Sequence, residues 1–231
     1  MTDQTADNSL LSPPGEPLGA DIRNRIFIYL GTLIVLMAFA SPHGGLIEIP
    51  LSFVLKNQLH LEAHELAQFR LVAAIPLYFS FLFGFVRDTW NPLGLADRGF
   101  MLLFGGACAL LYITFAFVPL TTPTLLAATI LLTASFLFIS SAQNGLASVV
   151  GQQHAMSGQI SAAWNIFGSV PTVAALLAGG ALSEWLEGQN ADSAVRFLFL
   201  FGAAMAAAIA LFALWRPAAV FDNVASERSS A

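Results

Sequence analysis

Six long runs of apolar residues set the strongest limit on what this chain can fold into. Each run has about the 20 mainly apolar residues that a helix needs to cross the hydrocarbon core of a membrane. The runs are longer than the alternating strands of a membrane β-barrel and are apolar on every face, so they predict helices. The predicted fold class is an all-α membrane protein with six transmembrane helices, at residues 26–54, 66–86, 100–120, 125–150, 157–182 and 197–215.

Composition excludes several other classes of protein. Apolar residues make up 57% of the chain and charged residues only 10%, whereas soluble domains have about 45–50% and roughly 25%. An ordinary soluble enzyme, a disordered chain and a nucleic-acid binder are therefore excluded. Polar tails are predicted at residues 1–21, which lack the features of a cleaved signal peptide, and at 217–231.

The sequence also lacks the motifs of common catalytic sites. It has no phosphate-binding glycine loop, no zinc-ligand spacing and no arguable Ser/His/Asp set. Its single cysteine, Cys108, excludes a disulfide within the chain. We therefore expect no enzymatic activity, no cofactor and no metal.

The positions of the basic residues predict the orientation in the membrane. Basic residues concentrate on the cytoplasmic side of membrane proteins, and placing both termini there puts six of the nine on that side. A location in the cytoplasmic (inner) membrane with both termini inside is therefore predicted. The inner set is Arg23, Arg25, Arg87, Arg98, Arg216 and Arg228, and the outer set is Lys56, Arg70 and Arg196.

The two halves of the chain resemble each other at an offset of about 95 to 100 residues. Because each half contains three predicted helices, the second half must enter the membrane from the opposite side. Residues 22–120 and 121–216 are thus predicted to form an inverted repeat, which is a common design of transporters. Three matches support it: SPHGGL at 41–46 with SAQNGL at 141–146, Pro76 and Gly84 with Pro171 and Gly179, and LFG at 103–105 with LFG at 200–202.

The junction before the third predicted helix carries a family resemblance. It has Gly84, three residues and Asp88, then Pro92 and Gly94, and finally a basic Arg98. This pattern resembles the N-terminal six-helix half of the major facilitator superfamily, in particular its folate–biopterin transporter-like branch. The resemblance implies half of a major facilitator fold and secondary transport of a small organic solute.

The chain departs from this family in two ways. The usual basic cluster is reduced to Arg98, with the acid Asp97 beside it. Family members usually have twelve helices, whereas this chain ends after six with a polar tail. A half-size protein that pairs with itself or with a second six-helix half is therefore one expectation, and a truncated transporter copy is another.

Charged residues inside predicted helices are expensive, so each one suggests a function. Glu48 and Arg70 flank the turn between the first and second predicted helices. They are expected to lie at similar depth near the outer surface and to form an ion pair. The pair could form an outer gate or include a proton-linked carboxylate, or it could be a static pair at the membrane interface.

Polar residues near a predicted break in the first helix suggest a substrate site. Pro42 and two glycines interrupt this helix around His43, and we expect a matching break around Gln143 and Asn144. Paired breaks of this kind indicate substrate sites, and Trp164 and Asn165 are further candidates. The alternative for all five residues is hydrogen bonding and packing between helices.

The family resemblance gives Asp88 and Arg98 a role as a conformational latch that binds an adjacent helix end in one state. Gly84 would then permit close helix approach. The alternative is a solvated cytoplasmic loop.

Two functions from different classes remain open. The first is a carrier module that contacts the lipid bilayer and a small-molecule solute, acts as a homodimer or with a second half, and binds no nucleic acid. The second is a non-transporting membrane adaptor or assembly factor built on a degenerate carrier half.

Overall fold

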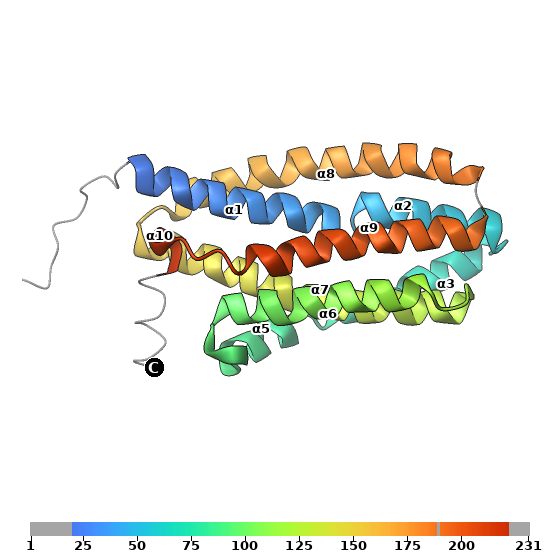
Figure 1. Ribbon diagram of the computed structural model, residues 1–231, viewed down its shortest axis with the longest axis horizontal. Helices are drawn as coiled ribbons and strands as arrows, with labels where there is room; N and C mark the ends of the chain where they lie inside the picture. Colours follow the sequence, from blue (N-terminus) through green and yellow to red (C-terminus); the bar gives the residue numbers. More distant parts are fainter. Residues whose placement is uncertain (1–19, 189, 222–231) are drawn as a thin grey trace, which may run out of the picture.

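The structure is a computed structural model that describes residues 20–188 and 190–221 (Figure 1). This part of the chain is helical and contains no strand. The helices are α1 (Ala20–Ala40), α2 (Gly45–Phe53), α3 (Ala63–Ala73), α4 (Ile75–Tyr78), α5 (Ser80–Thr89), α6 (Asp97–Ala116), α7 (Thr122–Gln153), α8 (Ser157–Glu187), α9 (Ala191–Phe212) and α10 (Ala218–Phe221), with a π-helical turn at Val54–Gln58 and a 3₁₀ turn at Pro92–Gly94.

Five helical segments of the described residues are long and apolar enough to cross a membrane, which confirms an all-α membrane protein. They are Ala20–Gln58, Asp97–Ala116, Thr122–Gln153, Ser157–Glu187 and Asp192–Phe212. The predicted single helix over residues 66–86 is instead divided among α3, α4 and α5. Pro76 lies in the second of these pieces and lacks the N–H that would continue the α-helical ladder.

The predicted break in the first span is present between α1 and α2. The backbone N–H of Ser41 donates to the Met37 carbonyl, but Pro42 has no backbone N–H. The N–H of Gly44 donates to the Ser41 carbonyl, not to the Ala40 carbonyl that an α-helix would use. The Ala40 carbonyl accepts a bond from the Tyr112 hydroxyl of α6 at 3.3 Å. The interruption is therefore supported by a buried contact from another helix.

The matching break that we expected at residues 141–146 is not present. Helix α7 runs from Thr122 to Gln153 through Gln143 and Asn144 without interruption. Position 142 is alanine where position 42 is proline. Because alanine keeps its backbone N–H and favours helices, Gly145 alone does not break α7.

Close contacts between helices occur at small residues. Gly105 of α6 faces the backbone of Ala210 in α9, and Gly202 of α9 faces the ring of Tyr112. Between α2 and α8, Gly179 lies against the backbone of Gly45. Small residues permit such approaches between membrane helices.

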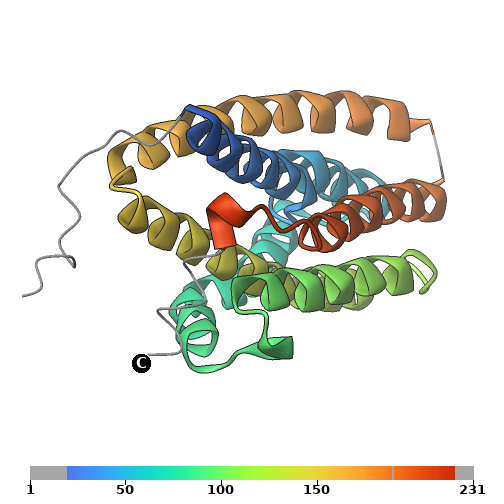
Figure 2. The same cartoon turned by 60° about the vertical axis from the view of Figure 1, so that its left-hand side comes forward.

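Helices α7 and α8 contact each other but pack mainly on different helices. Helix α8 packs on α1 and α2, whereas α7 packs on α3, α4, α5 and α6; α1 also packs on α9. Figure 2 shows α7 and α8 diverging from the turn that joins them. This divergence opens the cleft described below.

The helix ends gather in two groups. The start of α1, the α5–α6 connection, the α7–α8 turn and α10 lie at one end, which we call the Arg98 end (left in Figure 1). The α2–α3 and α6–α7 connections lie at the other, which we call the Lys56 end. At the Arg98 end, the predicted polar tail 217–231 starts with α10, whose Phe221 is buried with its ring 5.5 Å from that of Tyr29.

Candidate functional site

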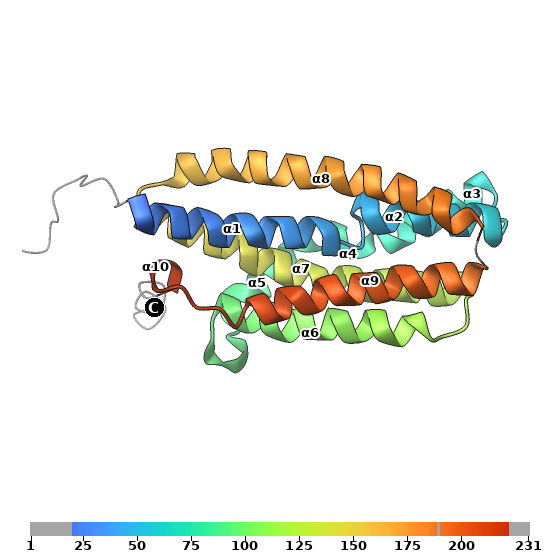
Figure 3. The same cartoon turned by 45° about the horizontal axis from the view of Figure 1, so that its top comes forward.

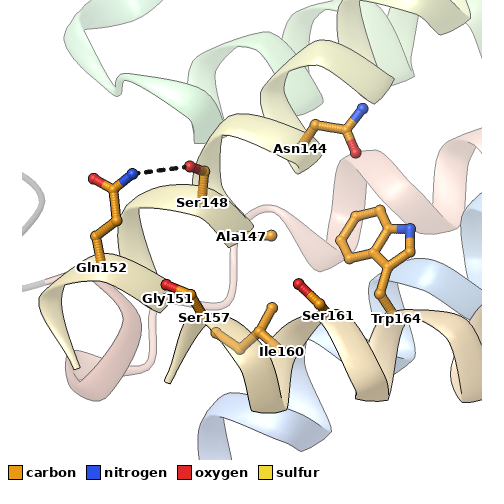
Figure 4. A pocket seen from close by; sticks show the side chains of 9 residues that line it. All are labelled: Asn144, Ala147, Ser148, Gly151, Gln152, Ser157, Ile160, Ser161 and Trp164. Carbon is orange, nitrogen blue, oxygen red and sulfur yellow. Dashed lines mark hydrogen bonds between the residues drawn. The ribbon is translucent and has the colours of Figure 1, made fainter. Parts of the chain in front are cut away.

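Two pockets lie in the cleft between α7 and α8. The first, the helix-break pocket, has a volume of about 340 Å³ and is lined by the α1–α2 break together with α7 and α8. The second, the α7–α8 pocket, has a volume of about 360 Å³ and lies nearer to the turn between the two helices (Figure 4). Trp164 of α8 lines both pockets. The two pockets are therefore neighbours between α7 and α8, with polar side chains making up a larger share of the lining of the α7–α8 pocket than of the helix-break pocket.

The helix-break pocket brings together three of the predicted substrate residues, His43, Gln143 and Trp164. Gln143 is only 4% exposed. The Nε2 atom of His43 lies 2.8 Å from the Thr133 hydroxyl, which itself donates to the Thr129 carbonyl at 2.6 Å. Because a hydroxyl has a single proton to donate, the bond to Thr129 assigns His43 Nε2 as the donor to Thr133.

The α7–α8 pocket contains Asn144 and several polar residues that the sequence analysis missed. Asn144, Ser148 and Gln152 follow one another at intervals of four along α7, and Ser157 and Ser161 do so along α8. Residues four apart share one face of a helix. This spacing is the signal that could have identified the pocket.

Asn165 does not join the other predicted substrate residues. Its side chain is exposed, and its amide donates to the Ser161 carbonyl of the same helix at 3.1 Å. It lines neither pocket of the cleft. The structure therefore gives Asn165 a local role on the surface of α8.

The predicted ion pair between Glu48 and Arg70 is present. The Arg70 Nε lies 4.0 Å from the Glu48 carboxylate, and Arg70 Nη2 donates to the Ser52 hydroxyl at 2.9 Å. Both charged side chains are about half exposed, so the pair adds little stability. With His43 they line a third pocket of about 190 Å³ on the other side of the α1–α2 break.

The charge network at the Arg98 end is centred on Arg87 and Asp97, which the sequence analysis did not select. Arg87 donates to both carboxylate oxygens of Asp97, at 2.7 and 3.0 Å, and to exposed Asp88 at 2.9 Å. Asp97 is 1% exposed.

Gly145 makes room for this network. A Cβ atom at position 145 would overlap the Arg87 guanidinium, so Arg87 joins α5 to both α6 and α7. By contrast, a Cβ atom at Gly84 would meet no atom within 4 Å. The structure therefore shows no close helix approach at Gly84, and it is Gly145 that leaves room for the Arg87 side chain.

Arg98 contacts the C-terminal end of α9, and its role as a conformational latch stays a prediction. Its Nε donates to the Ala213 carbonyl at 2.9 Å and its Nη2 to the Leu214 carbonyl at 3.0 Å. These carbonyls follow the last turn of α9, where a positive charge is favourable. Asp88 reaches no helix end and pairs with Arg87 instead.

Among the described residues, no group of three or more His, Cys, Asp or Glu side chains is placed to hold a metal ion. The site is thus a cleft between helices that combines apolar side chains with His43 and neutral polar groups. Comparisons of the chain with protein-family models, with curated proteins and with solved structures found no match.

Proposed function

We propose that this chain is a six-helix half of a secondary transporter of the major facilitator type, located in the inner membrane with its Arg98 end in the cytoplasm. The observation that carries the proposal is the cleft between α7 and α8, where a broken helix places His43 beside Gln143 and Trp164. Interrupted helices that line a cavity are typical of substrate sites in secondary transporters. The solute is a small organic molecule, driven by an ion gradient or by its own gradient.

The packing of the helices supports an inverted repeat. In the proposed repeat, α1 and α2 correspond to α7, the stretch α3–α5 corresponds to α8, and α6 corresponds to α9. Under this correspondence, the contact of α1 and α2 with α8 matches the contact of α7 with α3, α4 and α5. The contact of α1 with α9 likewise matches the contact of α7 with α6, and the contact between α6 and α9 matches itself. The observed contacts are thus the ones that two related three-helix units would make.

A sixth crossing is part of the proposal. Helices α3, α4 and α5 follow one another from the Lys56 end to the Arg98 end (Figure 3) and pack along α7. We assign this segmented stretch as the second span of the first repeat. Bent spans are tolerated where neighbouring helices satisfy the freed backbone groups.

We also propose that the cleft is completed by a second six-helix unit, in a homodimer or with a separate half. The cleft leaves polar side chains such as Asn144 and Ser148 exposed on membrane helices, and hydrocarbon cannot hydrogen-bond them. A mass measurement of the native assembly in lipid nanodiscs is expected to give at least twice the 24.6 kDa of one chain. A single chain in every nanodisc would contradict the pairing.

The carrier function is tested by uptake into proteoliposomes that contain the assembly. A panel of radiolabelled small organic solutes is offered, and at least one is expected to enter faster than into empty liposomes. The triple variant His43→Ala, Gln143→Ala and Asn144→Ala is expected to reduce this uptake at least tenfold while leaving the native mass unchanged.

The matched control is Asn165→Ala, because Asn165 lies outside both pockets of the cleft. Its uptake is expected to equal that of the unmodified chain. Equal uptake by the triple variant and the unmodified chain would contradict the site. An assembly that moves no solute, and whose triple variant loses a bound membrane partner, would favour the adaptor.

A further inference from the structure

We propose that the α7–α8 pocket binds an uncharged solute rich in hydroxyl or amide groups, of the size of a monosaccharide or a nucleoside. The inference rests on the proposed carrier function and names its class of solute. It starts from the chemistry of the nine lining residues. These are Asn144, Ala147, Ser148, Gly151, Gln152, Ser157, Ile160, Ser161 and Trp164.

The lining residues offer hydrogen bonds that protein groups leave largely unused. Figure 4 shows Asn144 and Ser148 on α7 opposite Ser157 and Ser161 on α8. Among these nine residues, all of them described, one hydrogen bond joins two side chains, from Gln152 Nε2 to Ser148 Oγ at 3.4 Å. Lipid chains cannot form hydrogen bonds with the remaining donors and acceptors, so water or a polar solute must fill the pocket.

No lining side chain carries a charge. An ion that entered the pocket would lose hydration without gaining a counter-charge, which is costly. The helix dipoles do not change this, because the negative end of α7 and the positive end of α8 meet at the same turn. The pocket therefore favours neutral solutes over anions and cations of the same size.

Trp164 adds a flat apolar wall to this polar lining. It lies at one end of the pocket, with Gln152 near the other (Figure 4). An indole ring is a suitable surface for the C–H face of a sugar ring or for a nucleobase. The volume of about 360 Å³ lies near the lower limit of ordinary ligand pockets, about 300–1,000 Å³, which indicates a small solute.

The test compares matched neutral and charged probes on the assembled protein in nanodiscs. D-Glucose is paired with D-glucuronate, and adenosine with adenosine monophosphate; each pair shares a ring and differs in charge. Binding is measured as a concentration-dependent rise in the thermal unfolding midpoint. We expect at least one neutral probe to bind, and its charged partner to bind at least tenfold more weakly.

Variants assign the binding to this pocket. The double variant Asn144→Ala and Ser161→Ala is expected to weaken binding at least tenfold, and Trp164→Leu is expected to do the same. Asn165→Ala is expected to bind as the unmodified chain does. The proposal is overturned if the charged partner binds as tightly, if the pocket variants bind normally, or if neither neutral probe binds at 50 mM.

Uptake of the same probes into proteoliposomes separates this proposal from the carrier function. Neutral probes that bind in the pocket without entering the liposomes would overturn the carrier and leave the assignment of the pocket intact. Uptake of a charged probe in preference to its neutral partner would keep the carrier and overturn the solute class.

Discussion

An Asp97→Ala variant is expected to lose about 3–5 kcal/mol of its free energy of unfolding. Asp97 is 1% exposed and accepts two hydrogen bonds from Arg87, whose side chain is 13% exposed. Removing the carboxylate leaves the guanidinium largely buried without its main partner, which costs more than the loss of an exposed pair. The loss is measured by reversible unfolding in mixed micelles.

The matched control for this prediction is Asp88→Ala. Asp88 contacts the same guanidinium, but its side chain is 65% exposed, so we expect a loss below about 1 kcal/mol. The double variant Arg87→Met and Asp97→Leu is expected to recover much of the stability, because it removes both buried charges. Equal losses in Asp97→Ala and Asp88→Ala would contradict the central place of the Arg87–Asp97 pair.

A Gly179→Ala variant is expected to lose about 1–3 kcal/mol, because the added methyl group overpacks the contact between α2 and α8. At this position a Cβ atom would collide with the Gly45 carbonyl and lie 3.2 Å from the Leu46 Cα. Both neighbours are backbone atoms and cannot rotate away. The helices must separate next to the α1–α2 break, so a fall in solute uptake is expected as well.

Gly180→Ala provides the control one residue further along α8. A Cβ atom at Gly180 would meet no atom within 4 Å, and alanine favours the helix over glycine by about 1 kcal/mol. We therefore expect a neutral or slightly stabilising effect on the thermal unfolding midpoint. A midpoint for Gly179→Ala equal to that for Gly180→Ala would show that α2 and α8 do not touch at this crossing.

The long apolar helices could be predicted from the sequence because length and hydropathy alone decide whether a helix can span a membrane. The break between α1 and α2 was predictable for a similar reason, since Pro42 removes a backbone donor whatever its surroundings. The division of residues 66–86 into three helices was not predicted, although Pro76 marked the place. The expected break in α7 is absent because the two matching segments differ at the residue that matters. Position 42 is proline, whereas position 142 is alanine, which keeps its backbone N–H.

The candidate site was predicted only in part. His43, Gln143 and Trp164 line one pocket and Asn144 lines the next, whereas Asn165 lines neither of them. Arg87 was overlooked because its role depends on the space that Gly145 leaves on a distant helix. Such a contact depends on tertiary packing, and no local pattern in the chain encodes it.

The division of residues 63–89 into three short helices has a consequence for how the protein is made. Insertion machinery recognises long, uniformly apolar helices, and this stretch, which carries Arg70 and two bends, is not among the five segments that qualify. Its helices α3, α4 and α5 all pack on α7, which follows them in the chain. We therefore expect this stretch to settle stably in the bilayer only after the ribosome has released α7.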